Sequence, residues 1–305
     1  MVSVIVTTFN PVWEKLKATL RSVIEQKNIE IEIIIADDGS NDNKFSKITI
    51  FFQEYEFNNY ILIESKENMG TCLNFYRALK VAKYNYIKAI SPGDLLYDTS
   101  TLKKWYEFAS SKDADICFSN AVYYNDKSYE IIECKHNPAY MDIYRNTCGE
   151  ANCREEYLLL PDPVLGAALL TKKETTIKYM KLIIGKVKYC EDYFIKLFVA
   201  DGGRLCFFDS ITLWYEYGLG ISTNAKWEEL IKKDKQSCAK ILLEYSIMDW
   251  RWKRIWQYQA KTGNLPKWRI ILFPKLFSYL VTRKKKQHKT PINVDTSFLL
   301  NFFNC

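Results

Sequence analysis

The stretch Ile31–Ser40, IEIIIADDGS, constrains the fold of this chain more than any other part. Ile31 and residues 33–36 form an almost unbroken apolar and β-branched run, which is the pattern of a strand buried on both faces of a parallel sheet. The run stops at Asp37-Asp38-Gly39-Ser40. Open α/β sheets bind ligands outside the carboxyl ends of their strands, so this turn is a candidate binding site. A simple capped turn is the alternative, because Asp, Ser and Gly are ordinary turn residues.

Apolar runs alternate with helically spaced apolar residues along the first part of the chain. This alternation predicts βαβ units and a parallel sheet. The predicted strands are 2–8, 31–36, 60–64, 86–90 and 115–123, with helices at 12–26, 45–55, 70–83 and 99–110. Beyond them we predict loops over 125–162 with a short helix at 154–160, a strand at 166–171, helices at 173–184 and 191–200, paired strands at 204–217 and a helix at 226–247.

Composition limits the class of protein. The 305 residues, 48% of them hydrophobic, suffice for one large or two modest domains. We see neither a secretory leader pattern nor an apolar run long enough to span a membrane. The nine cysteines are scattered without CxxC pairs and indicate reduced thiols in a cytoplasmic protein. With two histidines, His-based triads and His-rich metal sites are not expected.

Positive charge is concentrated near the C-terminus. Residues 251–290 contain 12 Lys and Arg and no acidic residue, so the remaining 31 basic and 36 acidic residues leave the body at −5. A nucleic-acid partner is therefore not expected. Tryptophans alternate with these cations over 249–289, which fits a segment lying peripherally on an anionic membrane surface, on the inner face of the plasma membrane. Packing on the rest of the chain, or on a second copy in a homodimer, is the alternative.

Four features lie at predicted strand ends and converge on one sheet edge. They are Thr8-Phe9-Asn10, Asp37-Asp38, Asn68-Met69-Gly70 and Ser91-Pro92-Gly93-Asp94. A carboxylate can accept from a base or ribose, an aromatic ring can stack on a base, and a helix start places N–H groups near phosphate. This combination predicts a nucleotide pocket. The first turn has no glycine, which argues against a dinucleotide site and against a nucleotidyltransferase phosphate loop.

A second acidic pair, Glu191-Asp192, precedes a predicted helix. Acidic residues are common in a first helical turn, where the macrodipole favours them. The same pair could instead supply the general base that transfer to a hydroxyl requires.

Several motifs together resemble the inverting family 2 glycosyltransferases, of the bacterial surface-polysaccharide type. They are SVIVTTFN, IIIADDGS, ENMG before a helix, the acidic turn at Asp94, and CED at 190–192. The resemblance implies a GT-A fold: a Rossmann-like, mixed, mostly parallel sheet flanked by helices, with a helical C-terminal extension. It implies a catalytic domain over 1–222, with a nucleotide-sugar half (1–123) and an acceptor half (124–222), followed by a basic, aromatic extension over 223–305.

The resemblance also implies roles for individual residues. Asp192 would be the base and Glu191 its positioning partner. The implied nucleotide-binding residues are Thr8, Phe9 and Asn10 at the base, Asp38 supported by Asp37, and Asn68 and Gly70 near the diphosphate. The family holds Mn²⁺ or Mg²⁺ with an Asp-x-Asp turn, but here Ser91 and Gly93 replace two carboxylates and only Asp94 is left as a metal ligand.

By this resemblance, the expected function is transfer of a sugar from a nucleotide-sugar, UDP-linked, to a hydroxyl of a glycan or lipid-linked acceptor in surface polysaccharide or glycoconjugate synthesis. The alternative is a degenerate, non-catalytic scaffold that binds nucleotide-sugar or glycan. The reduced Asp-x-Asp turn favours the scaffold. The retained Glu191-Asp192 pair favours the enzyme, because a binder needs no base.

Overall fold

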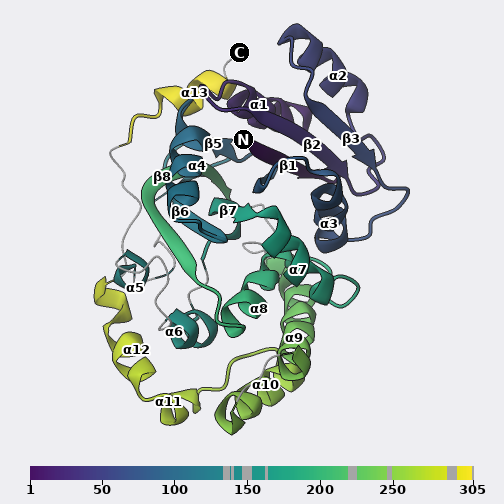
Figure 1. Cartoon of the computed structure of the whole chain (residues 1–305). Coiled ribbons are helices and arrows are strands. Elements are labelled where there is room, and N and C mark those ends of the chain that lie inside the picture. The colour runs from purple at the N-terminus through teal and green to yellow at the C-terminus, as the bar shows by residue number, and fades with distance from the viewer. Residues whose placement is uncertain are drawn as a thin grey trace.

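A computed structural model of the chain describes residues 1–132, 138, 141–145, 153–161, 164–218, 225–245, 249–286 and 294–303. In this part of the chain, the strands form one eight-stranded sheet in the order β3-β2-β1-β4-β7-β6-β8-β5 (Figure 1). The strands are β1 (Val2–Thr8), β2 (Ile31–Asp37), β3 (Tyr60–Glu64), β4 (Tyr86–Ile90), β5 (Leu95–Leu96), β6 (Ile116–Asn125), β7 (Leu169–Lys172) and β8 (Leu205–Tyr217).

Helices cover both faces of the sheet. One face carries α1 (Trp13–Ile24), α2 (Phe45–Glu54) and α4 (Thr101–Ser111), and its core contains the fully buried Trp105. The other face carries α3 (Thr71–Val81), α5 (Asp142–Arg145), α6 (Cys153–Leu159), α7 (Lys173–Ile183) and α8 (Phe194–Ala200). Single 3-10 turns lie at η1 (Gly166–Ala168), η2 (Glu191–Tyr193) and η3 (Ala225–Trp227).

The predicted mixed, mostly parallel sheet flanked by helices is confirmed. β1 pairs in parallel with both β2 and β4, and β2 pairs in parallel with β3. β7 runs antiparallel to β4 and β6, and β5 runs antiparallel to β8. In register, Thr8 pairs with Asp37, so the carboxyl ends of β1 and β2 finish side by side. The sheet therefore brings the polar turns after these strands to one edge.

Three predictions in the second half differ from the structure. Residues 204–217 are not paired strands: β8 is a single strand of 13 residues that runs parallel to β6. Asp209-Ser210 looks like a turn, but the register jumps from Phe208 to Ile211, and a bulge absorbs both residues. The strand expected at 166–171 begins only at Leu169, after the η1 turn. The helix expected at 191–200 likewise starts with the η2 turn.

The C-terminal segment is helical and packs on the rest of the chain. It contains α9 (Glu228–Tyr245), α10 (Trp250–Thr262), α11 (Arg269–Leu272), α12 (Lys275–Lys286) and α13 (Ser297–Phe303). Figure 1 shows α9 to α12 at the end of the molecule away from β1–β3, and α13 beside α1. Arg21 donates to the carbonyl of Asn301 at 3.1 Å, which ties α13 to α1. The predicted division at residues 222/223 lies outside the described residues and stays a prediction.

Candidate active site

The turns after β1 and β2 hold each other through the predicted nucleotide-binding residues. Thr8 Oγ1 donates to Asp37 Oδ1 at 2.9 Å, and the Ser40 N–H donates to Asp37 Oδ2 at 2.8 Å. Asp37 is fully buried. The Asp37 carboxylate therefore stabilises the turn through these two hydrogen bonds, which is compatible with the supporting role predicted for it. Asn10 closes the same turn, because its Oδ1 accepts the N–H of Asn41 at 3.0 Å.

Asp38 joins this turn to the start of α3. Its Oδ1 accepts the N–H of Met69 at 2.9 Å and its Oδ2 accepts the N–H of Gly70 at 2.8 Å. Gly70 caps α3 with a φ of +93°, where a side chain would be strained. Burial raises the pKa of Asp38, and the two backbone N–H groups oppose this rise. The N–H of Gly70 is thus occupied by a carboxylate and not free for a phosphate. Each Asp38 oxygen retains a lone pair for a further donor.

Phe9 is an exposed aromatic residue of this edge. Its side chain is 52% exposed at the end of β1, although most aromatic residues of the sheet are buried. An exposed ring beside a buried carboxylate fits the stacking role predicted for Phe9. Asn68 is half-buried, and the backbone from Glu67 to Asn68 lies so close to Gly39 that a Cβ on this glycine would clash at 2.5 Å.

The turn that contains Asp94 follows β4 and is anchored on both sides. The α1 residue Thr19 accepts the N–H of Gly93 at 3.0 Å and donates to the carbonyl of Asp94 at 2.8 Å. On the other side, Asp94 Oδ1 accepts the N–H of Glu216 at 3.0 Å. Asp94 is only 5% exposed, and burial raises its pKa.

This turn offers few protein ligands to a divalent cation. Mg²⁺ is commonly held by one or two carboxylates together with phosphate and water oxygens, and Asp94 offers one carboxylate with one oxygen already bonded. The nearby Glu216 carboxylate pairs with Lys15 at 2.5 Å, and its Oε2 would lie 2.5 Å from a Cβ placed on Gly93. Nowhere in the described residues do three or more His, Cys, Asp or Glu side chains gather as metal ligands.

The acidic pair Glu191-Asp192 lies against the middle of the sheet. It borders a small cavity of about 20 Å³ with Ala89 of β4 and Gly166 of η1. A Cβ on Gly166 would lie 3.2 Å from Asp192 Oδ2, so the absence of a side chain at 166 makes room for this carboxylate. Burial, followed by the charges of Asp192 and Asp234, raises the pKa of Glu191. Burial also raises the pKa of Asp192, which Lys196 opposes.

Asp234 of α9 positions the acidic pair and was not predicted from the sequence. Its carboxylate accepts three consecutive backbone N–H groups, from Lys188 at 2.9 Å, Tyr189 at 2.7 Å and Cys190 at 3.0 Å. Lys188 in turn accepts the N–H of Cys72 in α3 at 3.1 Å. The segment before Glu191 is therefore fixed between α9 and the start of α3. Nothing in the sequence around Asp234 signals this contact.

Lys88 was also missed, although the sequence carries a signal for it. This lysine interrupts the apolar strand β4 and is completely buried. Its Nζ donates to the carbonyls of Ala89 at 2.6 Å and Ala167. Burial lowers the pKa of Lys88, and the charge of Asp94 opposes this change.

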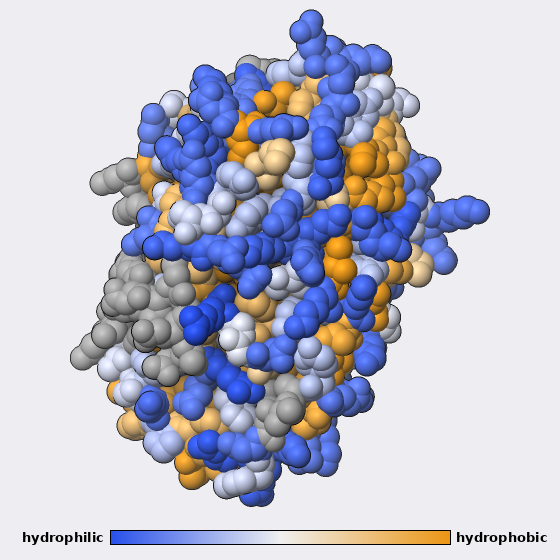
Figure 2. Space-filling model, viewed as in Figure 1, coloured by the Kyte–Doolittle hydropathy of each residue, from blue (hydrophilic) through white to orange (hydrophobic). Residues whose placement is uncertain are grey.

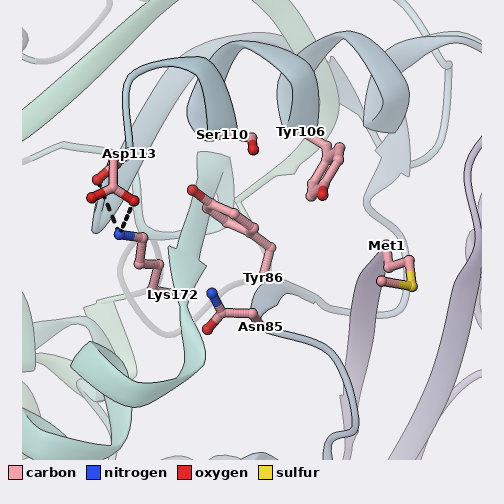
Figure 3. Close-up of a pocket in the computed structure, with 7 residues that line it drawn as sticks. All are labelled: Met1, Asn85, Tyr86, Tyr106, Ser110, Asp113 and Lys172. Atoms are coloured by element: carbon pink, nitrogen blue, oxygen red, sulfur yellow. Dashed lines mark hydrogen bonds and ion pairs between the residues drawn. The ribbon is translucent and has the colours of Figure 1, made fainter.

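A larger cavity lies at the other edge of the sheet and contains none of the predicted residues. It has a volume of about 180 Å³ and is lined by Met1, Asn85 and Tyr86 at the amino ends of β1 and β4 (Figure 3). Lys172 beside it pairs with Asp113 at 2.6 Å. The predicted residues of the turns after β1, β2 and β4 instead lie at the carboxyl edge of the parallel strands, where α/β sheets bind ligands.

Solved structures share this fold. TarS 1–349 of S. aureus in complex with UDP-GlcNAc aligns with a TM-score of 0.54 at 16% identity, over 93% of this chain and 87% of that one. The mannosyltransferase PcManGT of Pyrobaculum calidifontis, in complex with GDP-Man and Mn²⁺, aligns with a TM-score of 0.56 at 13% identity, over 92% and 70%. The fold is therefore of the GT-A type.

The sequence identifies the family. The pattern described as Glycosyl transferase family 2 matches residues 3–173, and the chain belongs to this family, a family of glycosyltransferases (EC 2.4). The dTDP-rhamnosyl transferase RfbG of Shigella flexneri is 24% identical over 216 residues, which are 70% of this chain. The match spans 64% of the length of that relative.

Proposed function

We propose that this protein is an inverting glycosyltransferase that moves a sugar from a nucleoside diphosphate, UDP above all, to a hydroxyl of a glycan or lipid-linked acceptor. The observation that carries the proposal is the link between two groups of residues through the start of α3: Asp38 accepts the N–H of Gly70, and the carbonyl of Lys188, just before Glu191, accepts the N–H of Cys72. Phe9 and Asp38 lie at the ends of β1 and β2, and Asp192 lies against β4 and η1. Support for UDP as the nucleotide comes from TarS, which aligns with this chain and is solved with UDP and with UDP-GlcNAc.

Asp192 acts as the general base in the proposed reaction. It takes the proton of the acceptor hydroxyl as that oxygen attacks the anomeric carbon from the face opposite the diphosphate. The new bond joins the acceptor oxygen to the sugar, and the bond to the diphosphate breaks with its electrons on the leaving nucleotide. The configuration at the anomeric carbon is therefore inverted. Glu191 positions the base, and Asp38 with Phe9 holds the nucleotide.

Donor hydrolysis by the purified protein tests the proposal. We expect release of nucleotide from one class among UDP-, GDP- and TDP-sugars, stimulated by the right acceptor and abolished in Asp192→Asn. The assay is run in Mn²⁺ and in EDTA, because the resemblance implies a cation at Asp94 and the turn offers it a single carboxylate with one oxygen already bonded. Nucleotide binding without turnover, for every donor and for a panel of glycan and lipid acceptors, would establish the non-catalytic scaffold instead.

The acceptor side is proposed to work at a membrane surface. Among the described residues, no helix combines the length and the apolar character needed to cross a bilayer. Four apolar side chains in and around α11 and α12 are nevertheless exposed: Trp268 (36%), Ile271 (76%), Phe277 (59%) and Val281 (62%). We call them the C-terminal apolar surface. Figure 2 shows apolar residues among polar ones at this end of the molecule. No acidic residue occurs over 251–290 to repel anionic lipid.

Sedimentation with lipid vesicles measures the proposed binding to a membrane surface. The protein should pellet with vesicles that contain phosphatidylglycerol and stay in solution with pure phosphatidylcholine. Ile271→Ser with Phe277→Ser should weaken this binding by at least about tenfold, because each exposed side chain gains about 1.5–3 kcal/mol when it is buried. Ile50→Ser, at an equally exposed position on α2, serves as the control. If the double variant instead converts a dimer to a monomer with unchanged vesicle binding, this surface is a contact between two copies.

A further inference from the structure

Lys88 is a buried lysine at a defined place in the sheet, and the charge of Asp94 favours its ammonium form against the effect of burial. Its side chain has no solvent exposure, and its Nζ donates to the carbonyls of Ala89 and Ala167. The Nζ also lies 5.6 Å from the centre of the Trp105 ring. Burying an ammonium group is costly unless polar partners compensate for the lost water, so a lysine here needs a reason beyond packing.

The two carbonyls place this charge between the proposed donor and acceptor sites. Ala89 belongs to β4, which leads directly into the turn that ends at Asp94. Ala167 belongs to η1, whose Gly166 lies against the carboxylate of Asp192. A donor diphosphate bound at the carboxyl end of β4 would lie over this position, where low polarity strengthens the field of a fixed charge.

The turn itself offers few ligands to a cation. Ser91 and Gly93 carry no carboxylate, and the carboxylate of Glu216 fills the space in front of Gly93 while it pairs with Lys15. The chain thus has the buried Lys88 below the turn and the carboxylate of Asp94 in it, and each of the two groups favours the charged form of the other.

We propose that the Lys88 ammonium, in place of a divalent cation, offsets the negative charge of the donor diphosphate and of the leaving nucleotide at this turn. The inference rests on the proposed function, because it assumes that a nucleoside diphosphate binds here. Lys88 does not touch the reacting atoms in this proposal. Its charge acts from behind the backbone of strand β4 and of the η1 turn.

Calorimetric binding of UDP, GDP and TDP in EDTA and in Mn²⁺ tests the inference on the unmodified protein. We expect the dissociation constant of the preferred nucleotide to differ by less than about threefold between the two conditions. A gain of about tenfold or more in Mn²⁺ would overturn the inference and leave the proposed function intact. If none of the three nucleotides bound in either condition, the proposed function would fail and this inference with it.

Lys88→Met gives a second, independent readout. Methionine is an unbranched side chain only one heavy atom shorter than lysine and removes the charge, so binding of the diphosphate should weaken by about 10–100-fold. Binding of the matching nucleoside, which has no phosphate, should not change. Lys104→Met, at an exposed ion pair on α4, is the matched control. Equal losses for nucleoside and nucleotide would show that Lys88 is only structural and would contradict the inference. If the variant fails to fold, the comparison of EDTA with Mn²⁺ still decides.

Discussion

Asp192→Asn should lower turnover by a factor of roughly 10²–10⁴ and leave nucleotide binding unchanged. The amide has nearly the shape of the carboxylate but cannot accept the proton of the acceptor hydroxyl. Asp192 lies against Gly166 and Ala89, and none of the contacts of Phe9 or Asp38 involves it. Single-turnover transfer and calorimetric UDP binding, measured on the same preparation, separate the two effects.

Glu191→Gln is the matched control for this prediction. It alters the neighbouring residue by the same change of one oxygen to nitrogen, and its effect on turnover should be clearly smaller. If Glu191→Gln abolished transfer and Asp192→Asn did not, the roles of the two acids would be exchanged. Turnover near the unmodified level in both variants would remove the pair from the proton transfer.

Asp234→Ala should have the largest effect on the framework of the site. The carboxylate is 4% exposed and accepts the N–H groups of Lys188, Tyr189 and Cys190. Each buried N–H group that loses its partner costs about 1–3 kcal/mol, so the free energy of unfolding should fall by about 3 kcal/mol or more. Turnover should fall as well, because the backbone that carries Glu191 loses its anchor. Denaturant titration and steady-state kinetics measure the two effects.

Asp234→Asn separates the charge of this residue from its hydrogen bonds. The base works only when it is deprotonated, so activity falls as the pH drops below its pKa. Burial raises the pKa of both Glu191 and Asp192, and the negative charge of Asp234 raises both further. In the unmodified protein, turnover should therefore begin to fall at a pH above the pKa of an ordinary carboxyl group. In Asp234→Asn this fall, the acid limb of the pH profile of turnover, should move to lower pH.

The control for this shift is Glu229→Gln, which removes an exposed charge from the same helix. Its pH profile should match that of the unmodified protein. An acid limb that stays in place in Asp234→Asn would show that Asp234 holds the turn without influencing the ionisation of the acidic pair.

The first half of the fold could be predicted because its signals are local. The strands at Val2–Thr8, Tyr60–Glu64 and Tyr86–Ile90 have the predicted bounds, and the helices between them differ from prediction by a few residues at their ends. Here each strand is a short apolar run, and each helix repeats its apolar residues at a fixed spacing. The resemblance to family 2 glycosyltransferases rested on the turns between these elements, and the family match over 3–173 confirms it.

The second half was predicted less well because its pairings join distant residues. A bulge at Asp209-Ser210 looks the same as a turn until β6 is seen to pair on both sides of it. Asp234 lies more than 40 residues from the N–H groups of Lys188 and Tyr189, and only the packing of α9 brings them together.

The sequence by itself determined the alternation of strands and helices, the family, and the residues that meet at the carboxyl edge of the sheet. These follow from side-chain periodicity and from turn residues, which depend on near neighbours in the chain. Only the tertiary structure decided that the Gly70 N–H is occupied by Asp38, that Asp234 holds the segment before Glu191, and that Lys88 is buried beside the Asp94 turn. The free energy of a hydrogen bond or a buried charge depends on which distant groups surround it, and no local pattern encodes those surroundings.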